Sequence, residues 1–185
     1  MVGFYEQLER DLGEIRDAGL WRELREIESA QSARIKFGGR EFINFSSNDY
    51  LGLAGHPALG QAAREAIEQF GVGSGASRLI CGSLQPHHEL ESALAKWQGT
   101  EAALVFSTGF AAAQGVLTSL LGRGDVVILD KKAHASMIDG AKLSGATLRI
   151  FRHNDLENLE KLLQWAAGQG GRVLVASESV FSMDG

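Results

Sequence analysis

The fold is decided by the stretch Val126-Val127-Ile128-Leu129-Asp130, an apolar run that ends on a carboxylate. Such a run is typical of a strand that is buried on both faces. On both sides of it, short apolar runs alternate with helical patterns. We predict strands at residues 102–106, 126–129, 147–151 and 172–177, and helices at residues 110–121, 135–143 and 156–167. This alternation predicts an α/β fold, a three-layer αβα domain around a mostly parallel sheet.

The first hundred residues carry other patterns. Apolar side chains at helical spacing among many charges predict an amphipathic helix over residues 4–24, with a break near Gly19. Residues 34–45 form two alternating runs around Gly38-Gly39, a pair that suits a tight hairpin turn. Two further helices are predicted at residues 57–70 and 86–98.

Composition narrows the class of protein. The chain has 185 residues, of which 44% are hydrophobic and 22% charged, values close to those of globular proteins. Its net charge of −5 gives no reason to expect nucleic acid or an anionic membrane as a partner. A single cysteine, Cys81, excludes an intrachain disulfide. With no signal-peptide pattern in residues 1–27 and no long apolar run, we expect a cytoplasmic protein without a membrane span.

Polar residues that can bind a ligand follow three of the predicted strands. Thr108 and Gly109 lie where the first strand turns into a helix, and unpaired N–H groups at such a junction suit a phosphate. His134 follows the second strand, and its imidazole can stack on an aromatic ring or move a proton. Glu178 and Ser182 follow the last strand. Because the carboxyl ends of parallel strands share one edge of a sheet, we expect one common pocket there.

Each position also has a structural interpretation. Small residues often form the turn between a strand and a helix, His134 can cap the helix that it precedes, and residues 177–185 can be an ordinary turn. The segment His153-Asn154-Asp155 resembles helix-capping chemistry more than a site.

Two other motifs are set aside. Residues 71–76 fit the G-x-G-x-x-A dinucleotide pattern, but a predicted helix precedes them where that motif needs a strand. His87 and His88 lack the cysteine or helical H-E-x-x-H partners of a metal site, so we expect no metal.

Several sequence blocks, taken in order, resemble the α-oxoamine synthases, a family of pyridoxal-phosphate enzymes. The blocks are Asn44-Phe45-Ser46-Ser47-Asn48-Asp49-Tyr50-Leu51-Gly52-Leu53, Gly73-Ser74-Gly75-Ala76-Ser77-Arg78, Phe106-Ser107-Thr108-Gly109-Phe110, Asp130 with His134-Ala135-Ser136, and Glu178 with Val180-Phe181-Ser182-Met183-Asp184-Gly185. The resemblance covers nearly the whole chain and is weakest before Ile35. It implies the fold-type-I major domain, with an N-terminal arm and hairpin at residues 1–47 and the first part of that domain at residues 48–185.

The resemblance also implies roles for individual residues. Thr108, Gly109 and Phe110 would lie beside the cofactor, and Ser182 would hydrogen-bond to it. His134 would stack on the pyridine ring and help to orient the carbonyl group during condensation.

On the substrate side, the resemblance points to Asn48 and Glu178. Arg22 would match an arginine that meets a substrate carboxylate.

The family condenses an amino acid with an acyl thioester, acyl-CoA or acyl-ACP, and binds its cofactor at a homodimer interface. The blocks favour members that join L-alanine to a pimeloyl thioester, with members that acylate glycine as the alternative. The family's Schiff-base lysine would follow Gly185, and no lysine of this chain matches its context. We therefore expect the chain alone to be inactive, and an assembly or cofactor-binding module remains the alternative of another class.

Overall fold

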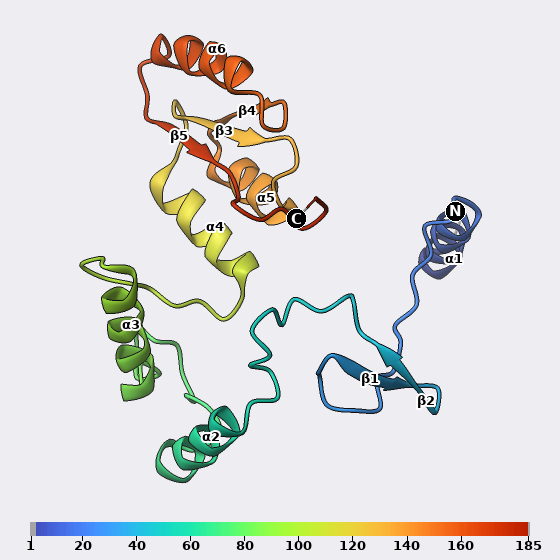
Figure 1. Cartoon of the computed structure of the whole chain (residues 1–185). Coiled ribbons are helices and arrows are strands. Elements are labelled where there is room, and N and C mark those ends of the chain that lie inside the picture. The colour runs from blue at the N-terminus through green and yellow to red at the C-terminus, as the bar shows by residue number, and fades with distance from the viewer. Residues whose placement is uncertain (1–2, 185) are drawn as a thin grey trace. The chain divides into compact units, whose positions relative to one another are not determined.

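The computed structural model describes residues 3–184 of the chain (Figure 1). The chain divides into two compact units, Met1–Gly82 and Ser83–Gly185. The boundary lies after Gly82, whereas the predicted one lies after residue 47. The assignment of residues 48–185 to a cofactor-binding domain stays a prediction.

The second unit has the alternating order that the sequence predicts. Its elements are α3 (Gln85–Gln98), α4 (Gly109–Leu120), β3 (Val126–Asp130), α5 (Ala135–Ser144), β4 (Thr147–Phe151), α6 (Leu156–Ala167) and β5 (Val173–Ala176). The three strands are parallel in the order β4-β3-β5. In their register Val126 lies opposite Thr147 on one side and Val173 on the other.

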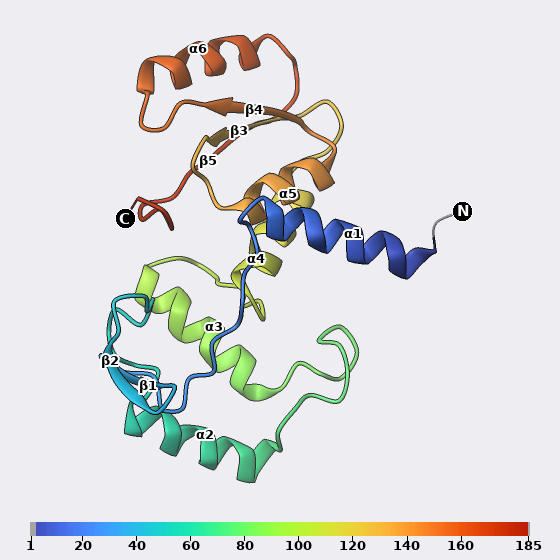
Figure 2. The same cartoon turned by 90° about the vertical axis from the view of Figure 1, so that its right-hand side faces the viewer.

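Helices cover both faces of this sheet, which confirms the three-layer αβα arrangement. Val127 and Leu129 of β3 pack with Leu117 of α4 and Ala141 of α5. On the other face, the alternate β3 residues pack with Phe151 and with Ala166 of α6. Figure 2 shows α6 on one side of the strands and α4 and α5 on the other.

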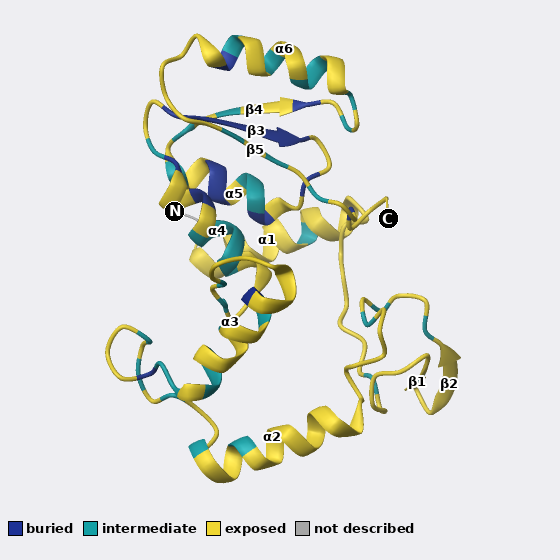
Figure 3. Ribbon diagram, turned by 60° about the vertical axis from the view of Figure 1, so that its left-hand side comes forward, coloured by how far each residue is buried: buried dark blue, intermediate teal, exposed yellow. Residues whose placement is uncertain are grey.

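The central strand lies in the middle of the core. All five β3 residues are buried, and Ile128 and Leu129 have no exposed surface (Figure 3). Burial of side chains this size contributes roughly 1.5–3 kcal/mol each. The continuous apolar run in the sequence therefore predicts the central strand of the sheet.

Local sequence signals set the helix ends. Asp155 accepts a hydrogen bond from the N–H of Asn158 at 2.8 Å and so caps α6, as the sequence predicts. Gly99 ends α3 in the left-handed conformation, with φ of 69°.

One predicted strand is not formed. Residues 102–106 have no ladder partner among the described residues, and Leu104 is 68% exposed. The apolar pattern supplies strand propensity, but a strand also needs a neighbour to take its N–H and C=O groups. Here the N–H of Val105 donates to the carboxylate of Glu91 at 2.9 Å instead.

The first unit contains α1 (Phe4–Asp17), β1 (Arg34–Phe37), β2 (Arg40–Ile43) and α2 (Pro57–Phe70). The hairpin is confirmed: β1 and β2 are antiparallel, and Gly38 and Gly39 between them have φ of 56° and 71°. Helix α1 ends before Gly19, and α2 ends at Gly71. No helix within residues 3–184 is long and apolar enough to cross a membrane.

Candidate functional site

The carboxyl edge of the second unit's sheet gathers the predicted site residues of that unit. Strands β3, β4 and β5 are parallel, so Asp130, Phe151 and Ala176 end at one edge. Helix α5 begins just after β3. Helix α4 packs on α5 and leads through residues 121–125 into the start of β3, so its first turn lies toward the same edge.

The first turn of α4 is open to a ligand. The hydroxyl of Thr108 accepts a hydrogen bond from the N–H of Ala111 at 3.0 Å and caps the helix. The N–H groups of Gly109 and Phe110 have no hydrogen-bond partner within residues 3–184. A Cβ on Gly109 would meet nothing within 4 Å. Free N–H groups at a helix start, next to open space, fit a phosphate group.

His134 caps α5 and is held by Glu178, which follows the neighbouring strand β5. Its Nδ1 accepts from the N–H of Ser136 at 3.2 Å and lies 2.8 Å from that residue's hydroxyl. The backbone N–H of His134 donates to the carboxylate of Glu178 at 2.7 Å. The capping interpretation of His134 is thus confirmed. The exposed ring keeps Nε2 without a partner within the described part of the chain, so it can also meet a ligand.

Glu178 and Ser182 follow β5 at the same edge. The carboxylate of Glu178 joins the exit of β5 to the exit of β3 through His134. Ser182 is exposed in a turn between buried Phe181 and Asp184. The structure therefore connects Glu178 and His134 directly, and Ser182 follows Glu178 closely in sequence at the same edge. Their predicted roles toward cofactor and substrate stay predictions.

A network of charged residues at this edge was not predicted from the sequence. Nδ1 of His153, just after β4, lies 2.9 Å from the carboxylate of Asp130, and Nε2 lies 3.4 Å from that of Asp184. Lys132 forms an ion pair with Asp184. The prediction that His153 belongs to helix capping is wrong, because Asp155 caps α6. A charged residue at the end of a fully buried strand was the signal that could have found this network.

Asp130 is the buried centre of the network. Its side chain is 1% exposed. Burial alone would raise its pKa, but hydrogen bonds from the N–H of Lys132, from His153 and from the N–H of Asn154 together hold the pKa below the ordinary value of 3.8. The carboxylate is therefore ionised and collects donors from the exits of β3 and β4.

The remaining predicted site residues lie in the first unit. The guanidinium of Arg22 donates to the carbonyl oxygens of Gly19 and Trp21. The side-chain oxygen of Asn48 lies 3.4 Å from the hydroxyl of Tyr50. Both Arg22 and Asn48 are exposed, and their predicted contact with substrate stays a prediction.

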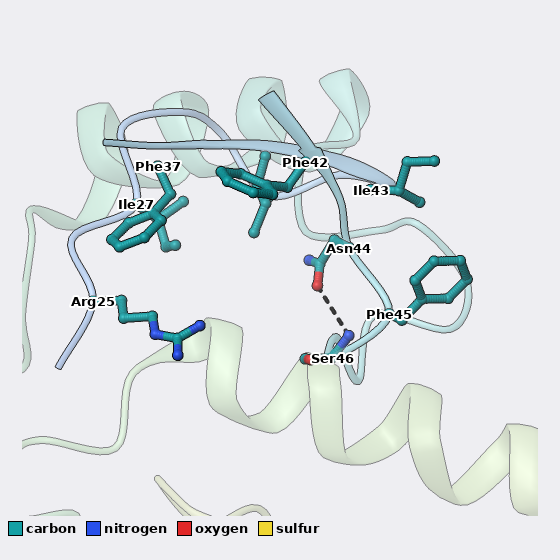
Figure 4. Close-up of a pocket in the computed structure, with 9 residues that line it drawn as sticks. Arg25, Ile27, Phe37, Phe42, Ile43, Asn44, Phe45 and Ser46 are labelled. Carbon is teal, nitrogen blue, oxygen red and sulfur yellow. Dashed lines mark hydrogen bonds between the residues drawn. The ribbon is translucent and has the colours of Figure 1, made fainter. Parts of the chain in front are cut away.

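The first unit also holds a cavity that contains none of the predicted site residues. It has a volume of about 360 Å³ and lies against the hairpin, with Arg25, Asn44 and Ser46 as its polar lining (Figure 4). The side chain of Asn44 accepts from the N–H of Ser46 at 3.0 Å. Within residues 3–184 no group of three His, Cys, Asp or Glu side chains could hold a metal ion.

Known proteins share both the sequence and the fold of this chain. It is 49% identical over 175 residues to an 8-amino-7-oxononanoate synthase of Geobacter sulfurreducens, a match that covers 95% of this chain and 44% of that one. The chain thus spans a little under half the length of the curated relatives it matches.

Solved structures of serine palmitoyltransferases show the same fold. The enzyme of Sphingomonas wittichii superposes with a TM-score of 0.86 at 34% identity, over 98% of this chain and 47% of that one. A serine palmitoyltransferase of S. paucimobilis, whose structure holds pyridoxal phosphate, gives 0.85 at 34% identity over 97% of this chain and 45% of that one.

The predicted resemblance to α-oxoamine synthases is therefore confirmed, and so is the fold class. The family model for aminotransferase class I and II matches residues 40–185, far more than half of the sequence. The chain, with its parallel sheet, therefore belongs to the aminotransferase class I and II family, whose cofactor is pyridoxal 5′-phosphate.

Proposed function

We propose that the chain provides cofactor- and substrate-binding residues of a pyridoxal-phosphate-dependent acyltransferase that condenses L-alanine with a pimeloyl thioester, pimeloyl-CoA or pimeloyl-ACP. This is the reaction of 8-amino-7-oxononanoate synthases in biotin biosynthesis. The observation that carries the proposal is the open first turn of α4, with free N–H groups at Gly109 and Phe110. His134 is the N-cap of α5, the helix on which α4 packs. The 49% identity to a synthase of this kind supports the proposal.

The cofactor, when bound, supplies an electron sink for the α-carbon of the amino acid. The N–H groups of Gly109 and Phe110 would hold its phosphate, which the positive end of α4 also attracts. The ring of His134 would lie against the pyridine, and its free Nε2 would donate to the substrate carbonyl. Ser182 would hydrogen-bond to the cofactor from the other strand exit.

Glu178 has a defined task in this arrangement. Its carboxylate accepts the backbone N–H of His134 and so fixes the start of α5, which carries the imidazole. On the substrate side, we propose that Asn48 and Arg22 contact the amino acid and the acyl carboxylate. We also propose a homodimer as the active assembly.

The phosphate contact is tested by Gly109→Leu. Because nothing lies within 4 Å of a Cβ at Gly109, a side chain can begin there, and a leucine would occupy the ligand's approach. Loss of the hydrogen bonds from this turn should weaken the affinity for pyridoxal phosphate about tenfold or more, measured by equilibrium dialysis. The thermal midpoint should stay unchanged. Gly122→Ala is the matched control, since a Cβ there also meets nothing. Equal affinity in both variants would contradict the proposed site.

The reaction itself is tested with the protein expressed from its own gene. Release of labelled carbon dioxide from carboxyl-labelled alanine should require a pimeloyl thioester. Release from glycine with acetyl-CoA in its place would favour the glycine-acylating alternative. If neither substrate pair leads to release of carbon dioxide, and the protein still binds the cofactor, the second candidate described below is favoured.

The second candidate is a module that binds the cofactor without a covalent bond. One observation favours it: Lys132, at the carboxyl edge, is ion-paired with Asp184, so its amino group is already engaged by a carboxylate. After borohydride treatment of the chain with pyridoxal phosphate, peptide mass spectrometry should find no modified lysine. A stoichiometric label at Lys131 or Lys132 would contradict this candidate.

A further inference from the structure

The segment that carries Ser182 has almost no regular structure to hold it. Strand β5 ends at Ala176, and Phe181 to Asp184 form a turn closed by one backbone hydrogen bond, from the N–H of Asp184 to the carbonyl of Phe181 at 3.2 Å. The side chains at the two ends of the turn, however, reach back to the sheet. Phe181 is only 6% exposed, and Asp184 is paired with Lys132.

Both ends of the turn meet the same imidazole, that of His153. Its ring lies edge-on to Phe181, with centroids 4.6 Å apart and an interplanar angle of 84°. Its Nε2 lies 3.4 Å from the carboxylate of Asp184 and 3.1 Å from the side-chain amide nitrogen of Asn154, while Nδ1 bonds to Asp130. One side chain from the exit of β4 thus connects the exit of β3 to the turn after β5, across the full order β4-β3-β5.

The backbone next to His153 fits this task. Asn154 has φ of 55°, the one positive value outside glycine among the described residues. Asparagine tolerates this conformation better than most residues. In it, the Asn154 N–H points to the second oxygen of Asp130 at 3.4 Å, so His153 and Asn154 together engage both oxygens of that buried carboxylate. The imidazole is therefore anchored on its Nδ1 side and extends toward the turn on its Nε2 side.

We propose that His153 is a positioning residue that fixes the Phe181–Asp184 turn, and with it the Ser182 hydroxyl, at the carboxyl edge of the sheet. The turn is held at both ends, so the exposed Ser182 between them has one preferred position. The consequence for cofactor binding rests on the proposed function, in which Ser182 contacts the cofactor. The role of His153 in fixing the Phe181–Asp184 turn does not depend on the proposed function.

Two conservative substitutions of His153 distinguish the contributions of its two ring nitrogens. The side-chain amide of His153→Asn can replace the donor Nδ1 toward Asp130 but is too short to reach Asp184. The longer amide of His153→Gln can replace Nε2 toward Asp184. The first readout is backbone ¹⁵N relaxation of Phe181 to Asp184, which reports mobility on the ps–ns timescale. The second is the dissociation constant for pyridoxal phosphate, and the third is the thermal midpoint.

We expect His153→Asn to raise the mobility of the turn and to weaken pyridoxal phosphate binding roughly three- to tenfold, the factor of one hydrogen bond. His153→Gln should restore both more fully. Ser182→Ala should weaken binding without mobilising the turn, and adding His153→Asn to it should cause little further loss, since both changes act through one hydroxyl.

Unchanged relaxation at Phe181 to Asp184 in His153→Asn would overturn the proposal. So would equal mobility in the Asn and Gln variants, because a general loss of stability does not distinguish the two nitrogens. If the wild-type chain fails to bind pyridoxal phosphate, the proposed function fails while the relaxation measurement still decides the role of His153. A folded His153→Asn variant with a mobile turn and unchanged affinity would separate the turn from cofactor binding and overturn the functional half.

Discussion

Asp130→Asn is the substitution that tests the buried network most sharply. The carboxylate accepts from the N–H of Lys132 at 2.8 Å and from His153 at 2.9 Å through one oxygen, and from the N–H of Asn154 at 3.4 Å through the other. An asparagine keeps one acceptor oxygen, but its NH₂ group then faces a backbone donor. It also removes the charge that pairs with His153.

The expected cost follows from this geometry. A buried hydrogen-bonding group left without its partner destabilises a protein by about 1–3 kcal/mol. Urea unfolding at pH 5, followed by circular dichroism, should show a loss of that size for Asp130→Asn. Asp139→Asn is the matched control, because Asp139 is exposed on α5 and a surface change of this kind stays within about 0.5 kcal/mol.

The lowered pKa of Asp130 also predicts how the loss of stability in Asp130→Asn changes with pH. The pKa of Asp130 lies below 3.8 in the folded protein, so the unfolded chain takes up a proton first as the pH falls. The stabilisation is therefore complete above pH 3.8 and is lost as the pH falls through the lowered pKa. The difference in unfolding free energy between wild type and Asp130→Asn should shrink below pH 3.8. A difference below about 0.5 kcal/mol at pH 5, or one that grows in acid, would refute the reasoning.

Three further substitutions test the fold around the site. Thr108→Ala should lower the urea unfolding free energy by about 1 kcal/mol through loss of the α4 cap, and Thr108→Ser should lower it less; equal losses would contradict the hydroxyl cap. Gly140→Ala should cost about 1–3 kcal/mol, because its Cβ would lie 2.9 Å from Leu117 where α5 packs on α4; a neutral or stabilising effect would show that the helices are not in contact there. Asp125→Asn should lower the urea midpoint at pH 6, and this effect should shrink as the pH falls below 3.8, since hydrogen bonds from the backbone N–H groups of Arg172 and Gly122 hold the pKa of Asp125 below 3.8. An effect that does not shrink in acid would argue against these hydrogen bonds.

The layers of the second unit could be predicted because its sequence signals are local. The apolar run 126–129 predicts a buried strand without knowledge of its neighbours, and Asp155 and Gly99 mark helix ends by their own chemistry. The hairpin is equally local, since two adjacent glycines set its turn.

What the sequence did not reveal depends on neighbours far along the chain. Residues 102–106 have strand propensity, but only a partner strand could have turned that propensity into a ladder. The local sequence His153-Asn154-Asp155 predicts a helix-capping segment. The contact of His153 with Asp130 follows from β4 lying next to β3, and no local pattern fixes that order. The site residues could be predicted from the positions where strands end. The charged network that joins those positions could be predicted only with knowledge of strand order and register.

The most direct test of the central claim, that pyridoxal phosphate binds at the carboxyl edge of the β4-β3-β5 sheet, is a titration followed through the backbone amide resonances of the chain. Saturable shifts should concentrate at Gly109, Phe110 and His134, and inorganic phosphate should reverse those at the first turn of α4. Shifts confined to exposed lysines, or spread through residues 1–82 with none at Gly109, would contradict the claim.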